Sequence, residues 1–156
     1  MRGAFLVLAP LTLWLAASPT WAAISRPDAF FRATSALVAD ASNDGPMRKL
    51  LADEVSFRII GGVSKTDVPK NYFGYMFGAW TVGVSRITAW NCHSTSTSED
   101  CEVAVLSRPE RKGAESKNQS CHMIIEYVAE KVRVVNVGGC KDAAQVMAGA
   151  NGKGAS

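Results

Sequence analysis

The hydrophobic periodicity of this chain changes at Trp80, and that change limits the folds the chain can adopt. Before Trp80 the apolar residues recur at the three- and four-residue spacing of amphipathic helices, in residues 27–41, 47–52 and 66–79. After Trp80 they alternate with polar residues, as in half-buried strands, in residues 81–97, 101–107, 120–128 and 131–137. This order predicts an α+β domain in which about three N-terminal helices pack on one face of a curved antiparallel sheet.

Capping residues set the predicted starts of two helices. Ser25 is suited to cap the first helix, with Pro27 and Asp28 in its first turn, where both residue types are well tolerated. Thr66 is the predicted N-cap of the third helix. One face of that helix is expected to carry Val68, Tyr72, Tyr75, Met76 and Ala79, with Phe73 and Phe77 beside it.

Two tight connections are predicted within the sheet. Residues 53–62 are rich in β-branched side chains and end in two glycines, which predicts a strand and a turn, with a short return strand at residues 63–64. Residues 120–137 predict a hairpin that turns at Ala129 and Glu130.

Residues 1–22 carry the pattern of a secretory signal. A charged start precedes an apolar run in residues 4–17, and small residues lead to a cleavage site that we expect after Ala22. The run is shorter than the roughly 20 residues needed to span a bilayer, although an uncleaved N-terminal anchor is the alternative. Cleavage leaves one domain at residues 23–147 and a flexible tail at residues 148–156, in the periplasm or outside the cell.

All the cysteines lie in the strand-rich half of the chain: Cys92, Cys101, Cys121 and Cys140. Their spacing differs from the short intervals typical of structural zinc sites, so we expect no metal. An even count of cysteines in an exported chain favours two disulfides. Three pairings satisfy this count, and the sequence leaves all of them open.

The charge balance argues against several function classes. The formal net charge of +3 falls by one, to +2, when Arg2 leaves with the signal, which implies no strong attraction to nucleic acid or anionic membrane. There is no glycine-rich phosphate loop and no repeating βαβ pattern, so a dinucleotide fold is disfavoured and no cofactor is expected.

Three stretches of the sequence carry a resemblance to a known superfamily. They are residues 51–57 leading to two glycines, the aromatic segment at residues 71–75, and the hairpin that ends at residues 134–137. In these features the chain resembles the nuclear transport factor 2-like superfamily, which includes ketosteroid isomerase-like and polyketide cyclase-like proteins. The resemblance covers about residues 27–140 and implies a cone-shaped domain with an apolar pocket between sheet and helices. The superfamily holds enzymes, ligand binders and structural assembly domains, so the fold leaves the function open.

An enzyme with such a pocket needs an acid or base that projects into it. The carboxylate candidates are Asp40, near the end of the first helix, and Asp53, before the first strand. His93 and His122 are the only histidines, and their functional interpretation is a proton-transfer pair or a metal-binding pair. Strand alternation places His93 on the same face as Ile87. We favour the plainer interpretation, in which these four polar residues are exposed at strand and helix ends.

The further candidates for ligand binding are Tyr72, Tyr75, Arg86 and Trp90. Arg86, Thr88 and Trp90 are predicted on one face of a strand, where Arg86 would bind an acidic group and Trp90 would stack on the ligand. Tyr72 and Tyr75 would donate hydrogen bonds into the pocket. The alternative is cross-strand packing for the first set and a core position for the tyrosines.

The sequence favours an exported binding or interaction domain over an enzyme. The pocket implied by the resemblance would bind a small apolar ligand. The alternative is that the domain binds a protein partner. A ketosteroid isomerase-like isomerase or dehydratase is one alternative, and an anchored subunit of an envelope secretion or transfer machine is another. A homodimer is left open, and nucleic acid is not an expected partner.

Overall fold

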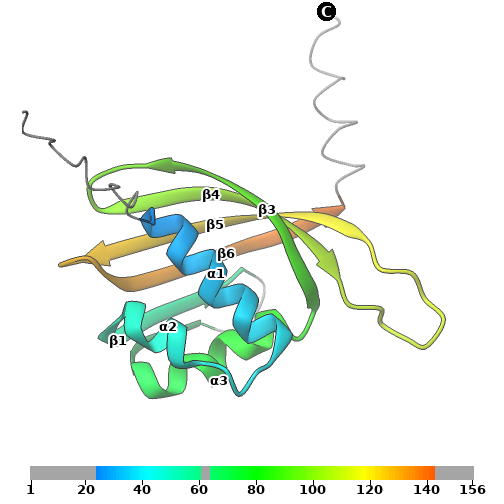
Figure 1. Cartoon of the computed structure of the whole chain (residues 1–156), viewed down its shortest axis with the longest axis horizontal. Helices are drawn as coiled ribbons and strands as arrows, with labels where there is room; N and C mark the ends of the chain where they lie inside the picture. Colours follow the sequence, from blue (N-terminus) through cyan, green and yellow to red (C-terminus); the bar gives the residue numbers. More distant parts are fainter. Residues whose placement is uncertain (1–23, 61–63, 143–156) are drawn as a thin grey trace, which may run out of the picture.

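A computed structural model describes residues 24–60 and 64–142 of the chain. The elements in this part of the chain are α1 (Arg26–Ala39), α2 (Gly45–Leu50), β1 (Leu51–Ile59), β2 (Ser64–Pro69), α3 (Lys70–Thr81), β3 (Val84–Ser94), β4 (Ser98–Ser107), β5 (Asn118–Val128) and β6 (Lys131–Asp142). The strands form one sheet in the order β2-β1-β6-β5-β4-β3. Figure 1 shows a curved sheet with the three helices of the described residues together on one side. The predicted α+β class is confirmed.

The first helix begins where its capping residues predict. The Ser25 hydroxyl accepts a hydrogen bond from the backbone N–H of Asp28 at 3.3 Å, which confirms the predicted N-cap. The helix buries Phe30 and Phe31 against the sheet side of the domain and ends at Ala39.

β2 occupies residues that were predicted to begin the third helix. Ser64–Pro69 pair with β1, with Val68 opposite Val55, so Thr66 is an exposed strand residue and the predicted N-cap is wrong. The hydrogen-bonded ladder with β1 outweighs the local capping signal of Thr66, because pairing satisfies more of the backbone groups. The helix therefore starts at Lys70, directly after Pro69.

α3 turns a different face inward from the one predicted. Phe73, Phe77 and Trp80 are buried at four- and three-residue spacing. Tyr72 is 63% exposed, so the prediction that it lies on the inner face is wrong. The phenylalanine rings carry no polar atom that needs a partner when buried, whereas the exposed tyrosine keeps its hydroxyl in water.

The last four strands follow the predicted order. β5 and β6 turn at Ala129 and Glu130, whose φ angles of 48° and 63° form the two-residue turn favoured in hairpins. β1 pairs with β6 in parallel, so this one pairing departs from the expected antiparallel sheet. β4 starts at Ser98, ahead of its predicted start at Cys101.

The disulfides join directly opposed residues on neighbouring strands. Cys92–Cys101 links β3 to β4, and Cys121–Cys140 links β5 to β6, both with Cα atoms 4.1 Å apart. The expectation of two disulfides is confirmed, and the strand register fixes the pairing. Such bonds are characteristic of proteins that mature in an oxidising compartment.

Some predicted features lie outside the described residues. They are the signal at residues 1–22, the glycine turn at residues 61–62 and the tail at residues 148–156. Within the ranges that the structure describes, no helix has the length and apolar character needed to cross a membrane.

Candidate functional site

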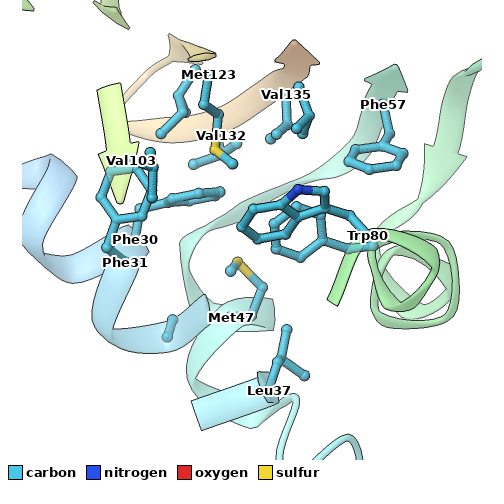
Figure 2. Close-up of a cluster of buried hydrophobic side chains, with 14 of the residues drawn as sticks. Phe30, Phe31, Leu37, Met47, Phe57, Trp80, Val103, Met123, Val132 and Val135 are labelled. Carbon is cyan, nitrogen blue, oxygen red and sulfur yellow. The ribbon is translucent and has the colours of Figure 1, made fainter. Parts of the chain in front are cut away.

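Aromatic rings fill the interior between the helices and the sheet. The ring centroid of Phe77 lies 5.2 Å from the centroids of Phe73 and Trp80, and 5.4 Å from the centroid of Phe57. Figure 2 shows side chains from α1, β1 and α3 directed into this one core. The side chains of Phe57, Phe73, Phe77 and Trp80 therefore occupy the space in which the resemblance implied an apolar pocket.

The two predicted acid–base carboxylates are exposed at the surface. Asp40 accepts hydrogen bonds from the hydroxyl and the backbone N–H of Ser42, at 2.7 and 2.9 Å, and these bonds lower the pKa of Asp40. Asp53 contacts the Lys70 ammonium at 2.7 Å, and this hydrogen bond and charge lower the pKa of Asp53. Both carboxyl groups are held ionised by surface partners, away from the interior.

The two histidines lie on the face of the sheet opposite the buried core. His122 Nε2 is 2.6 Å from Asp100 Oδ1, and His93 lies opposite Asp100 across the β3–β4 pairing. A bulge between Ile87 and Ala89 reverses the phase of β3, so the prediction that His93 shares a face with the buried Ile87 is wrong. In the described part of the chain, no group of three or more His, Cys, Asp or Glu side chains is placed to hold a metal.

The predicted ligand-binding residues are dispersed. Tyr72 is exposed on α3, and the side chain of Tyr75 is outside what the structure describes. Arg86 is exposed, whereas Trp90 is half-buried beside α1. The bulge in β3 separates the two, so the prediction that Arg86, Thr88 and Trp90 share one face is wrong at Trp90.

Trp90 contacts the first helix. Its ring stacks on Phe31 at a centroid distance of 5.3 Å, and its Nε1 donates to Asp28 Oδ1 at 2.9 Å. The hydrogen bonds from Ser25 and then from Trp90 lower the pKa of Asp28. In this structure Trp90 therefore positions α1 on the sheet.

The sequence pattern did not predict a buried carboxylate, which the structure places at Glu99 of β4. Glu99 is 1% exposed, and its oxygens contact the Arg26 guanidinium at 3.2 Å and the hydroxyl of Ser94. Arg26 also donates to the backbone oxygens of Thr95 and Ser96, at 2.6 and 2.9 Å. A charge this deep is retained because it is paired and hydrogen-bonded.

Tyr127 of β5 completes this buried polar cluster. The Arg26 guanidinium lies 4.5 Å from the centre of its ring. Its hydroxyl is buried and has no hydrogen-bond partner among the described residues. Burial, followed by the charge of Glu99, raises the pKa of Tyr127 well above its usual range, so the phenol stays neutral.

One signal in the sequence points to Glu99. It precedes Cys101, Val103 and Val105 at the two-residue spacing of the inward face of β4. A strand begun at Ser98 would have placed the carboxylate inside. Arg26 comes from a helix far away in the sequence, so the pairing itself is visible only in three dimensions.

Two hollows flank the turn between β5 and β6. The larger, named here the hairpin-tip groove, is open and has a volume of about 890 Å³. Its charged lining residues are Arg48, Lys49, Lys70, Lys131 and Arg133, with Asp53 and Glu54. The smaller, named the anchor pocket, has a volume of about 110 Å³ and is lined mainly by apolar side chains, among them Ala29, Phe30, Leu50 and Val132. These hollows combine segments that are distant in sequence, which explains why no local pattern predicted them.

No family model and no curated protein sequence matches this chain. Among solved structures it is similar to an NTF2-like protein from Anabaena variabilis, with a TM-score of 0.57 and 11% identity over 72% of this chain and 84% of that one. A SnoaL-like polyketide cyclase from Agrobacterium tumefaciens gives a TM-score of 0.57 and 11% identity over 80% of this chain and 97% of that one. A proposed isomerase from Rhodopseudomonas palustris gives 0.55 and 9%, over 81% and 97%. These similarities are similarities of fold, and the chain has the NTF2-like fold that the resemblance implied.

Proposed function

We propose that this chain is an exported binding domain that engages a protein partner or a small apolar ligand, and that its interior carries out no reaction. The observation that carries the proposal is the packing around Phe77. Three rings, those of Phe57, Phe73 and Trp80, lie within 5.4 Å of it and take up the space that a substrate would need.

The positions of the polar candidates support this proposal. Asp40, Asp53, His93 and His122 are all exposed. Except for His93, for which no hydrogen bond is found in the described part of the chain, their partners are other surface groups. A general acid or base must lie within hydrogen-bond reach of its substrate, so surface carboxylates and histidines would not serve an interior site.

The disulfides support the export part of the proposal. Disulfides such as these two form and persist mainly in oxidising compartments. Mass spectrometry of the protein recovered from cells tests export directly, because we expect a mature chain that begins at Ala23. Recovery with residues 1–22 attached would favour the anchored envelope subunit instead.

The binding role is tested with the purified mature domain. We expect it to retain a specific protein from envelope extracts, and we expect the pair to re-form from purified components. A panel of apolar ligands followed by thermal shift tests the small-molecule alternative. Robust turnover of a substrate that is lost on replacing a single carboxylate would contradict the proposal.

An isomerase or dehydratase is the second candidate, favoured by the buried Glu99 near Tyr127. The name polyketide cyclase belongs to two of the similar proteins, and this chain would share the chemistry only if Glu99 reached a substrate. Isomerisation of an unsaturated ketone, followed by ultraviolet absorbance, is expected to be lost in Glu99→Gln and kept in the control Asp100→Asn if this candidate is correct. Absence of turnover by the unaltered domain would rule it out.

A further inference from the structure

The hairpin-tip groove and the anchor pocket adjoin. Val128 and Lys131 line the groove and Val132 lines the pocket, so both hollows include the β5–β6 turn. They also meet where α2 joins β1, because Leu50 lines the pocket and Leu51 lines the groove. The hollows share no lining residue, but their lining residues are sequence neighbours at both places, so the two hollows lie next to each other on opposite faces of the hairpin tip.

Positive charge predominates in the groove, with five cationic and two acidic lining residues. Three of the cations have carboxylate partners: Arg48 with Asp44, Lys70 with Asp53, and Arg133 with Asp67. The side chains of these three cations are 48%, 40% and 31% exposed. Exposed ion pairs of this kind are weak and exchange partners readily, so the cations stay available to an acidic ligand.

Lys49 and Lys131 are the two cations of the groove that have no carboxylate partner among the described residues. The Lys131 ammonium donates to the backbone oxygen of Lys49 at 2.6 Å, which brings the two residues together across 82 positions of sequence. Neither lysine forms a salt bridge in the described part of the chain, and two such neighbouring charges favour an anion placed beside them.

The anchor pocket is small, and its lining is mainly apolar, with Arg26 and Glu130 as its charged members. Its volume of about 110 Å³ is below the ~150 Å³ of a cavity that holds benzene, so it fits one aliphatic side chain. Phe30, Leu50 and Val132 supply apolar contacts, and Tyr127, whose buried hydroxyl is unpartnered in the described part of the chain, also lines it. Buried pockets that take one apolar anchor are typical of the energetic centre of protein interfaces.

We propose that the hairpin-tip groove and the anchor pocket together bind a segment of a partner protein that carries acidic residues next to an aliphatic side chain. This inference rests on the proposed binding function and names its site. The aliphatic side chain enters the anchor pocket, and the carboxylates lie along the groove near Lys49 and Lys131. The cations come from α2, α3 and β6, and this spread matches the several carboxylates of a peptide better than one phosphate.

A random peptide library, displayed on phage and selected against the purified mature domain, tests the inference. We expect the enriched sequences to combine Asp or Glu with Leu, Ile or Val. In the double variant K49E/K131E, we expect the affinity for an enriched synthetic peptide to fall by at least about tenfold, because two attractive charges become repulsive. Added salt should weaken binding to the unaltered domain, and alanine in place of the aliphatic residue of the peptide should weaken it too.

The matched control is K112E/K117E, which reverses two exposed lysines in the loop before β5, at the opposite end of the sheet from the turn. We expect this variant to bind the peptide as the unaltered domain does. Equal binding to K49E/K131E would overturn the inference and leave the proposed function standing, because another surface would then be in use. Failure to enrich any acidic sequence would overturn the inference. It would also be overturned if the unaltered domain bound no peptide but bound phosphatidylglycerol vesicles, and K49E/K131E lost that vesicle binding.

Discussion

The Arg26 guanidinium, at the start of α1, lies 3.2 Å from the buried carboxylate of Glu99 in β4. Arg26 also donates to two backbone oxygens in the turn between β3 and β4. One side chain therefore fastens the first helix to the edge hairpin of the sheet and neutralises the buried carboxylate.

Replacement of Arg26 should destabilise the domain. Arg26→Met keeps an apolar stem but leaves Glu99 without its counter-charge, so we expect the free energy of unfolding to fall by about 3 kcal/mol. This is the low end for a buried pair, because a quarter of the Arg26 side chain is exposed. Urea denaturation measures the change. Arg32→Met, at an exposed site of the same helix, should change stability by no more than about 0.5 kcal/mol, and equal losses in the two variants would contradict this role.

Asp28 should respond to pH through its two hydrogen-bond donors. Its pKa lies below the usual 3.8 in the folded state, so its contribution to stability is present above that value and is lost as pH falls through the folded pKa. Trp90→Phe removes the indole donor and should raise the pKa of Asp28 toward 3.8. Carboxyl-carbon NMR titration measures this shift, with Asp40 as the internal control because its partner is Ser42. An unchanged pKa of Asp28 in Trp90→Phe would refute the assignment.

The two disulfides should stabilise the fold unequally. The closed segments span 9 and 19 residues, for which chain entropy gives about 2.5 and about 3 kcal/mol. We therefore expect the paired alanine variant of Cys121–Cys140 to lose more stability than that of Cys92–Cys101. Chemical denaturation of both variants measures the difference. Reaction of all four thiols with an alkylating reagent in the native, unreduced protein would contradict the disulfides themselves.

Phe77 should be among the most sensitive positions of the core. It is fully buried and its ring contacts those of Phe57, Phe73 and Trp80. Phe77→Ala is expected to lower the free energy of unfolding by about 3–5 kcal/mol. Tyr72→Ala, on the exposed side of the same helix, should change it by about 0.5 kcal/mol or less. Near-equal stabilities of the two variants would show that the aromatic interior is loosely packed.

Features that depend on close neighbours in the sequence could be predicted. The Ser25 cap uses a backbone group three residues away, and the turn at Ala129 and Glu130 closes two adjacent strands. The change of periodicity at Trp80 separated the third helix from the last four strands for the same reason. These signals are complete within a few positions of the chain.

Features that depend on strand pairing could not be predicted. Ser64–Pro69 became a strand because β1 lies beside them. The bulge between Ile87 and Ala89 reversed the faces of every later side chain in β3, which separated Trp90 from Arg86. The disulfide pairing follows from the same registers, so it too required the assembled sheet.

The candidate surface was the least accessible to sequence reasoning. Lys49 and Lys131 become neighbours only when α2 packs beside the β5–β6 turn. Likewise, Glu99 acquires its partner only when α1 crosses the sheet. Charged residues at such positions carry no local pattern that distinguishes them from solvated surface residues.

The interior of the domain is packed, and we expect ligands to bind at the surface around the β5–β6 turn. NMR titration of the labelled domain tests this expectation most directly. The ligands are the enriched acidic peptides and a panel of apolar compounds that includes a keto steroid. We expect saturable shifts at Val128 and Val132, near the two hollows, and none at Phe57, Phe73 or Phe77. Saturable shifts at those three rings, accompanied by conversion of the ligand, would contradict this expectation.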